Sequence, residues 1–108
     1  MNDRKGNPPQ GWTFLTNHSH VILCLAQDRE ARLKDVAERV GITERAVQGI
    51  VSELEEARVL TRIRNGRRNQ YEIHAERPLR HPVEAHCKVQ SLLDMIGVGK
   101  PRGNRDRK

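Results

Sequence analysis

The sequence predicts a mainly helical chain with one small β-hairpin, an α+β fold in which the hairpin lies between three helices and a C-terminal helix. Apolar residues recur at helical spacing in the first half of the chain and again near its end. The segment RIRNGRRNQY, at 62–71, places an Asn-Gly pair between two runs suited to strands, which is typical of a hairpin.

Composition favours an anionic partner and a cytoplasmic location. The chain has 108 residues and a net charge of +6, but charge alone does not identify the partner. We expect no membrane association, because no apolar run approaches a membrane span and no signal peptide opens the chain. Both cysteines should be reduced. The terminal segments 1–11 and 98–108 are basic and rich in Gly, Pro and Asn, which predicts disorder.

The first helix is predicted from a cap residue and an apolar face. Trp12 and Phe14 precede it, and we expect them to form an extended lead-in that anchors to the core or to a partner subunit. Thr16 or Asn17 is suited to cap a helix that runs to about Gln27. A polar connector follows.

Two further helices are joined by a very short turn. Apolar residues at helical spacing predict a helix over 33–40, which Gly41 ends by tolerating a left-handed backbone. Thr43 caps the next helix, predicted over 44–58. The turn is too short for antiparallel packing, so the helices must cross steeply, as in a helix-turn-helix.

The stretch from Lys34 to Leu54 resembles the helix-turn-helix motif, with Ala37 at the helix contact, Gly41 in the turn and Val47 in the core. With the basic hairpin that follows, the chain is similar to winged helix-turn-helix transcriptional regulators of the MarR and ArsR types. This resemblance implies a DNA-binding domain over 12–77, made of a three-helix core and a two-stranded wing. It also implies that the second motif helix lies in the major groove.

The register of the hairpin is predicted from residue parity. The apolar residues of its two strands are all odd-numbered: Val59, Ile63, Tyr71 and Ile73. A two-residue loop at 65–66 would mix the two faces. We therefore expect a three-residue loop, 64–66, which pairs Val59 with Tyr71 and leaves Leu60 pointing outward.

In that register Arg62 and Arg68 face each other on the outer side, where like charges repel. A charged edge that discourages aggregation is one interpretation. Guanidinium groups, however, match phosphate oxygens and fit a narrow minor groove, which favours DNA. The predicted DNA contacts of the wing are Arg62, Arg64, Asn65, Gly66, Arg67 and Arg68.

The second motif helix supplies the predicted base contacts. Arg45 can donate two hydrogen bonds to guanine, and Gln48 can pair with adenine. Gly49 either allows close approach of the backbone to the DNA or reflects neutral drift, and both interpretations stay open. The predicted contacts around this helix are Lys34, Thr43, Glu44, Arg45, Gln48, Gly49 and Ser52, with Lys34 on a phosphate.

A C-terminal helix, within 78–97, is predicted to begin near Pro82 and to form a dimer interface. The resemblance implies a homodimer that reads half-sites about one helical turn apart; packing on its own subunit is the alternative. The predicted interface comprises Trp12, Phe14, Ala85, Val89, Leu92, Leu93 and Ile96.

We expect no metal, no other cofactor and no enzymatic activity. ArsR-type proteins often sense metals, but the possible ligands here lack suitable spacing: His18, His20, Cys24, His81, His86 and Cys87. No catalytic constellation is evident. The sequence therefore favours a dimeric, sequence-specific repressor that binds double-stranded DNA. A winged-helix module for RNA or protein contact is the alternative, and a small-molecule effector stays open.

Overall fold

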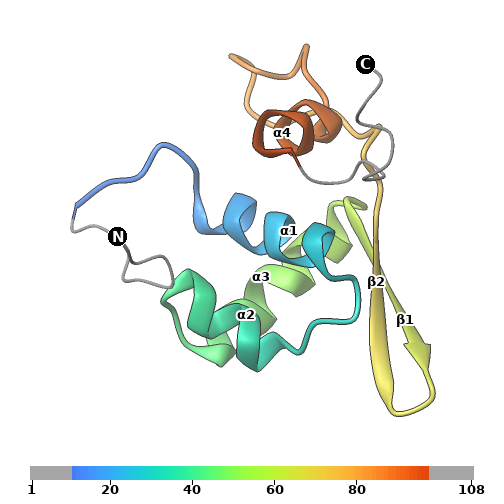
Figure 1. The fold of residues 1–108 in the computed structure, drawn as a ribbon. Coiled ribbons are helices and arrows are strands. Elements are labelled where there is room, and N and C mark those ends of the chain that lie inside the picture. Colours follow the sequence, from blue (N-terminus) through green and yellow to red (C-terminus); the bar gives the residue numbers. More distant parts are fainter. Residues whose placement is uncertain (1–10, 98–108) are drawn as a thin grey trace.

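The computed structural model describes residues 11–97, which form four helices and one antiparallel hairpin (Figure 1). Of the terminal segments predicted to be disordered, only Gly11 falls within this range. The elements are α1 (Asn17–Gln27), α2 (Leu33–Val40), α3 (Glu44–Glu56), β1 (Leu60–Asn65), β2 (Arg68–Ile73) and α4 (Val89–Ile96).

The first helix is the centre of the core. Thr16 caps α1, since its Oγ1 accepts a hydrogen bond from the Ser19 N–H at 3.3 Å. Every residue from Val21 to Leu25 is buried, because α1 contacts α2, α3, β2 and α4. The predicted bounds of this helix are confirmed.

The turn between α2 and α3 has the predicted geometry. Gly41 ends α2 with a φ of 88°, and its N–H donates to the Ala37 carbonyl at 2.8 Å. The Thr43 Oγ1 accepts from the Ala46 N–H at 3.0 Å and so caps α3. The helix ends at Glu56 rather than at residue 58, because Arg58 takes a left-handed φ of 65° before β1.

The hairpin has a different register from the predicted one. Arg62 pairs with Tyr71 and Asn65 pairs with Arg68, which leaves a two-residue loop at 66–67. Gly66 has a φ of 67°, and a glycine at the first position of a two-residue loop suits a type II′ turn. The predicted three-residue loop, and the opposition of Arg62 and Arg68, are therefore wrong.

This register also reverses the faces of β1. Leu60 pairs with Ile73 and is only 2% exposed, whereas Ile63 is 41% exposed. The prediction that Leu60 points outward is wrong, because the even-numbered residues of β1 share a face with Tyr71.

The C-terminal helix is shorter than predicted. Residues 78–88 form turns closed at the base by an antiparallel bridge between Pro78 and Lys88, and α4 begins only at Val89. Near Pro82 the backbone bonds are those of successive turns, since the Glu84 N–H donates to the His81 carbonyl and the Cys87 N–H donates to the Glu84 carbonyl, each three residues back, in place of the four-residue bonds of an α-helix. Ala85 is consequently exposed and outside the helix, while Val89 and Leu93 are buried.

The aromatic lead-in does not enter the core of its own chain. Trp12 is 72% exposed and Phe14 is 90% exposed. Figure 1 shows the lead-in extending away from the helices. Of the two alternatives for this segment, anchoring in its own core is wrong, and contact with a partner stays a prediction.

Candidate nucleic-acid interface

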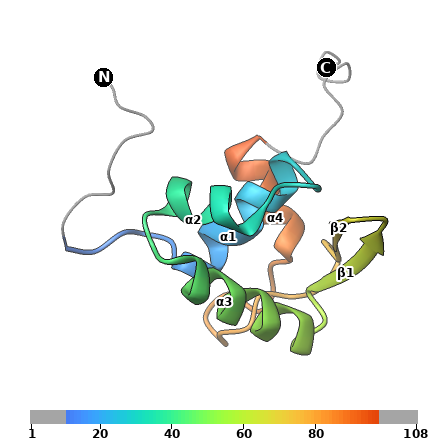
Figure 2. The ribbon, with the colours of Figure 1, turned by 90° about the horizontal axis from the view of Figure 1, so that it is seen from below.

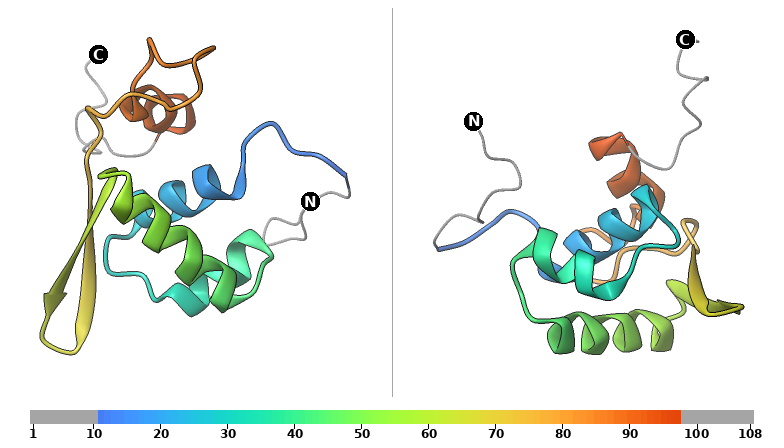
Figure 3. Two further views of the ribbon diagram at one scale, coloured as in Figure 1. Left: turned by 180° about the vertical axis from the view of Figure 1, so that it is seen from behind. Right: turned by 60° about the horizontal axis from the view of Figure 1, so that its bottom comes forward.

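One side of the molecule presents α3 and the hairpin together. In Figure 2, α3 runs across this side and the hairpin projects beside its C-terminal end. In the left view of Figure 3, the N-terminal half of α3 and the tip of the hairpin lie at the same end of the molecule. Any ligand that contacts one of these two elements is therefore close to the other.

The predicted contact residues on α3 are all exposed, as are Lys34 and Thr43: Glu44, Arg45, Gln48, Gly49 and Ser52. The buried residues of α3 are Val47, Ile50, Val51 and Leu54, so the helical period places Arg45 and Gly49 on the opposite, outermost face. A Cβ added to Gly49 would meet nothing within 4 Å. The open space confirms that this glycine is not required by packing within the chain.

A groove of about 670 Å³ separates α3 from the hairpin. Glu44, Gln48 and Ser52 lie on its helical wall, because residues at this spacing share one side of a helix. The other lining residues come from the connector, from the start of α2 and from the hairpin: Glu30, Ala31, Arg32, Leu33, Arg62, Arg67, Arg68, Asn69 and Tyr71. The structure thus brings together Gln48 and the arginines of the hairpin, which the sequence assigned to separate elements.

The Arg62 guanidinium is held by hydrogen bonds to another residue of the same chain. Its Nε donates to Glu55 Oε2 at 3.3 Å, and its Nη2 donates to Glu55 Oε1 at 3.1 Å. The guanidinium also lies 5.9 Å from the centre of the Tyr71 ring, within cation–π range. Arg62 therefore joins the end of α3 to the inner face of the hairpin.

Two other arginines of the hairpin also have partners. Arg68 forms an ion pair with Glu30 at 3.5 Å. The Arg64 Nε donates to the Gly66 carbonyl at 3.0 Å across the loop. These contacts offset the electrostatic repulsion among the four neighbouring arginines of the hairpin.

Four cations near this side are uncommitted. Within residues 11–97, the side chains of Arg32, Lys34, Arg45 and Arg67 have no hydrogen bond or ion pair. Arg67 lies at the tip of the hairpin and lines the groove. Arg45 and Lys34 are exposed but are not part of the groove wall.

Sequence reasoning missed several residues of this interface. Glu30 and Arg32 belong to the polar connector, to which the sequence assigned no functional contact, yet both line the groove. The connector is placed there because the Tyr71 N–H donates to the Arg29 carbonyl at 2.9 Å. No local signal in the sequence marks this bond.

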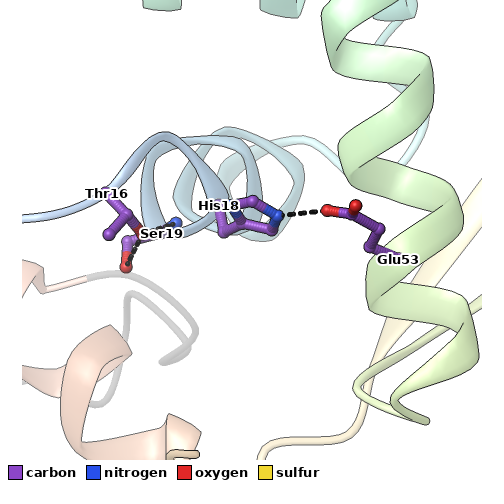
Figure 4. A network of polar contacts seen from close by, with 4 residues as sticks. All are labelled: Thr16, His18, Ser19 and Glu53. Carbon is purple, nitrogen blue, oxygen red and sulfur yellow. Dashed lines mark hydrogen bonds and ion pairs between the residues drawn. The ribbon is translucent and has the colours of Figure 1, made fainter. Parts of the chain in front are cut away.

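The possible metal ligands are dispersed. Within residues 11–97, no group of three or more His, Cys, Asp or Glu residues is arranged to hold a metal ion. The His18 Nε2 lies 2.6 Å from Glu53 Oε1, a contact that joins α1 to α3 (Figure 4).

Burial raises the pKa of the Cys24 thiol, and the nearby Arg39 opposes this more weakly. Within residues 11–97, no helix is both long and apolar enough to cross a membrane.

Comparison with known proteins supports the fold. No family model matches the chain, and a search of curated proteins finds no match. Among solved structures, the PcaV transcriptional regulator from Streptomyces coelicolor, in complex with its natural ligand, matches with a TM-score of 0.51 and 19% identity. The match covers 84% of this chain and 66% of that one, so this chain spans just under two thirds of the length of PcaV. This likeness confirms the winged helix-turn-helix fold that the sequence predicted.

Proposed function

We propose that this protein is a DNA-binding regulator of transcription, with α3 in the major groove and the tip of the hairpin on the phosphate backbone or in the minor groove. The observation that carries this proposal is the groove in which Gln48 faces the arginines of the hairpin, including the unpaired Arg67. A base-reading side chain next to a free guanidinium combines the two kinds of contact that sequence-specific recognition needs.

The free cations support a sharper division of roles than the sequence allowed. Arg45, on the outermost face of α3, is proposed to read a base edge. Lys34 and Arg67 are proposed to contact phosphates. Arg62 is proposed to orient the hairpin, because its guanidinium is already held by Glu55.

We further propose that the protein acts as a homodimer and represses transcription by occupying a promoter. Two copies related by a twofold axis would present two α3 helices to half-sites about one helical turn apart. The fold likeness to a transcriptional regulator supports the general role.

Selection of genomic fragments by the purified protein is the decisive experiment. The expected result is enrichment of one motif with twofold symmetry. Fluorescence anisotropy on the selected duplex should then show weaker binding for Arg45→Ala and Arg67→Ala. Arg77→Ala is the matched control, since Arg77 is an exposed arginine beyond the hairpin and away from the groove.

The two variants should weaken DNA binding in different ways. Arg45→Ala should lose discrimination at one base pair, whereas Arg67→Ala should weaken binding to every sequence. If the selection enriches no motif, or if duplex RNA competes as well as the selected DNA, the proposal is wrong and the RNA-binding alternative gains.

A further inference from the structure

Two glutamates contact two arginines of the hairpin, and the two ion pairs differ in geometry and exposure. Arg62 donates two hydrogen bonds to Glu55, and each side chain of this pair is 33% exposed. Arg68 meets Glu30 through one contact of 3.5 Å, and these side chains are 50% and 47% exposed. A strong charge-assisted hydrogen bond is about 2.7–2.9 Å long, and an exposed ion pair contributes little to stability. Arg68 can therefore exchange Glu30 for another anion with little loss of free energy.

The Glu30 carboxylate lies on the groove between α3 and the hairpin because the connector is fixed there. In Figure 1 the connector between α1 and α2 passes beside β2. The Tyr71 N–H donates to the Arg29 carbonyl at 2.9 Å, and the Glu30 N–H donates to the Asp28 Oδ1 at 3.0 Å. These two bonds hold the backbone next to Glu30 whether or not Arg68 contacts its side chain. The carboxylate accordingly stays near the groove when Arg68 leaves it.

The groove places this carboxylate among guanidinium groups. Arg32, Arg67 and Arg68 line the same groove as Glu30. Within the described residues, the side chains of Arg32 and Arg67 have no hydrogen bond or ion pair. Carboxylates and phosphates both present oxygens that match the fork of a guanidinium group. Glu30 is thus a competitor, for Arg68, of any phosphate that enters the groove.

We propose that Glu30 limits the affinity for DNA: it holds Arg68 in the free protein and loses it to a phosphate when a duplex binds. The inference rests on the proposed DNA binding and adds a residue that opposes it. Breaking the ion pair and leaving a carboxylate near phosphates both cost free energy, so Glu30 weakens the complex. Phosphate contacts carry no sequence information, and the reduction therefore applies to every sequence alike.

Fluorescence anisotropy with one duplex, over a series of salt concentrations, tests the exchange. Glu30→Gln keeps the shape of the side chain and removes its charge. Its affinity for the duplex should rise about three- to fivefold at low salt, as expected for the loss of one exposed ion pair. The gain should narrow as the salt concentration rises, because screening weakens the pair between Glu30 and Arg68.

Glu76→Gln is the matched control for net charge. Glu76 is exposed and lies outside the groove. This variant changes the charge of the chain by the same amount as Glu30→Gln, but it removes no partner of a groove arginine. It should bind the duplex much as the parent chain does.

Arg68→Gln shows whether Glu30 acts through Arg68. In this background, Glu30→Gln should raise the affinity no more than Glu76→Gln does, because the arginine for which Glu30 competes is absent. In the parent chain, Arg68→Gln should lower the slope of log affinity against log salt by about one unit, since one phosphate contact is lost. A purely structural role of the pair would change the urea midpoint and leave this slope unchanged.

Three outcomes would overturn the proposal, and they differ in what they imply for DNA binding. Equal affinities of Glu30→Gln and Glu76→Gln, with the parent chain still binding the duplex, would remove the exchange and leave the proposed function intact. The same gain from Glu30→Gln with and without Arg68 would show that Glu30 only repels DNA directly. A parent chain that binds no duplex would remove the proposed function and the exchange together.

A second variant decides the question if Glu30→Gln does not fold. Glu30→Asp keeps the charge but shortens the side chain, which withdraws the carboxylate from Arg68. It should also bind the duplex more tightly than the parent chain. Affinity equal to that of the parent chain would contradict the exchange.

Discussion

Arg62 and Glu55 join α3 to the hairpin through two hydrogen bonds, of 3.3 and 3.1 Å. Glu55 belongs to the last turn of α3, and Arg62 belongs to β1. The Tyr71 ring lies beneath the guanidinium. The angle between α3 and the hairpin is therefore set by a specific contact and not by chain connectivity alone.

Breaking this contact should lower the free energy of unfolding modestly. Both side chains are about one-third exposed, so solvent screens the pair, and the expected coupling is about 0.5–1 kcal/mol. A double-mutant cycle with Glu55→Gln and Arg62→Gln, followed by urea denaturation, measures it. A coupling energy of zero would mean that the contact does not hold the hairpin.

The salt dependence of DNA binding should distinguish the arginines of the hairpin. Arg67 has no internal partner in the described residues, so Arg67→Ala should reduce the slope of log affinity against log salt by about one unit. Arg62→Ala should change this slope less, because its charge is already balanced by Glu55. Equal losses from both variants would show that Arg62 leaves Glu55 for a phosphate. Arg77→Ala should leave the slope unchanged.

Gly49→Ala should stabilise the protein. Gly49 lies inside α3 with open space where a Cβ would be added, and alanine favours a helix over glycine by about 1 kcal/mol. Urea denaturation should show this gain. Duplex binding by the same variant decides between the two interpretations of Gly49: affinity falls if the backbone closely approaches the DNA, and is unchanged if the glycine reflects drift.

Gly66→Ala should have the opposite effect on stability. Gly66 also has open space around it, but its φ of 67° is one that alanine adopts only with strain. We expect a loss of about 1 kcal/mol in the free energy of unfolding. The same substitution at Gly49 serves as the control, and a loss at both sites would indicate that alanine is harmful for some other reason than φ.

The two cysteines should differ in reactivity. Burial raises the pKa of the Cys24 thiol, so at mildly alkaline pH less of it is the reactive thiolate. Cys87 is half-buried and should be modified first by a thiol reagent. Because the folded state holds the Cys24 proton more tightly, stability should fall as the pH rises above the ordinary pKa of a thiol. Cys24→Ser removes this dependence; faster modification of Cys24 than of Cys87 would contradict the prediction.

Both ends of α1 and α2, and the start of α3, could be read from the sequence because these helix ends depend on neighbouring residues. Thr16, Gly41 and Thr43 act within one turn of the chain, and each does what its residue type predicts. The register of the hairpin could not be read in this way. The apolar Ile63 led to the prediction that the odd-numbered residues of β1 face the core. The Ile63 side chain is exposed, and Leu60 occupies the core position instead.

Part of the candidate interface was also predictable from local sequence. Exposure of Arg45 and Gln48 follows from the period of α3. The partners of Arg62 and Arg68 are glutamates on other elements, Glu55 and Glu30. Such pairs become visible only when the chain is folded, and the DNA contacts of both arginines stay predictions.

The bond from the Tyr71 N–H to the Arg29 carbonyl makes the connector before α2 an extra support for β2. The hairpin is thereby braced from a segment far from it in the chain, in addition to its attachment to α3. A wing fixed in this manner loses little conformational entropy when it meets a ligand, since that loss occurred during folding. Association should accordingly be governed by encounter and orientation, without a slow closing step of the wing.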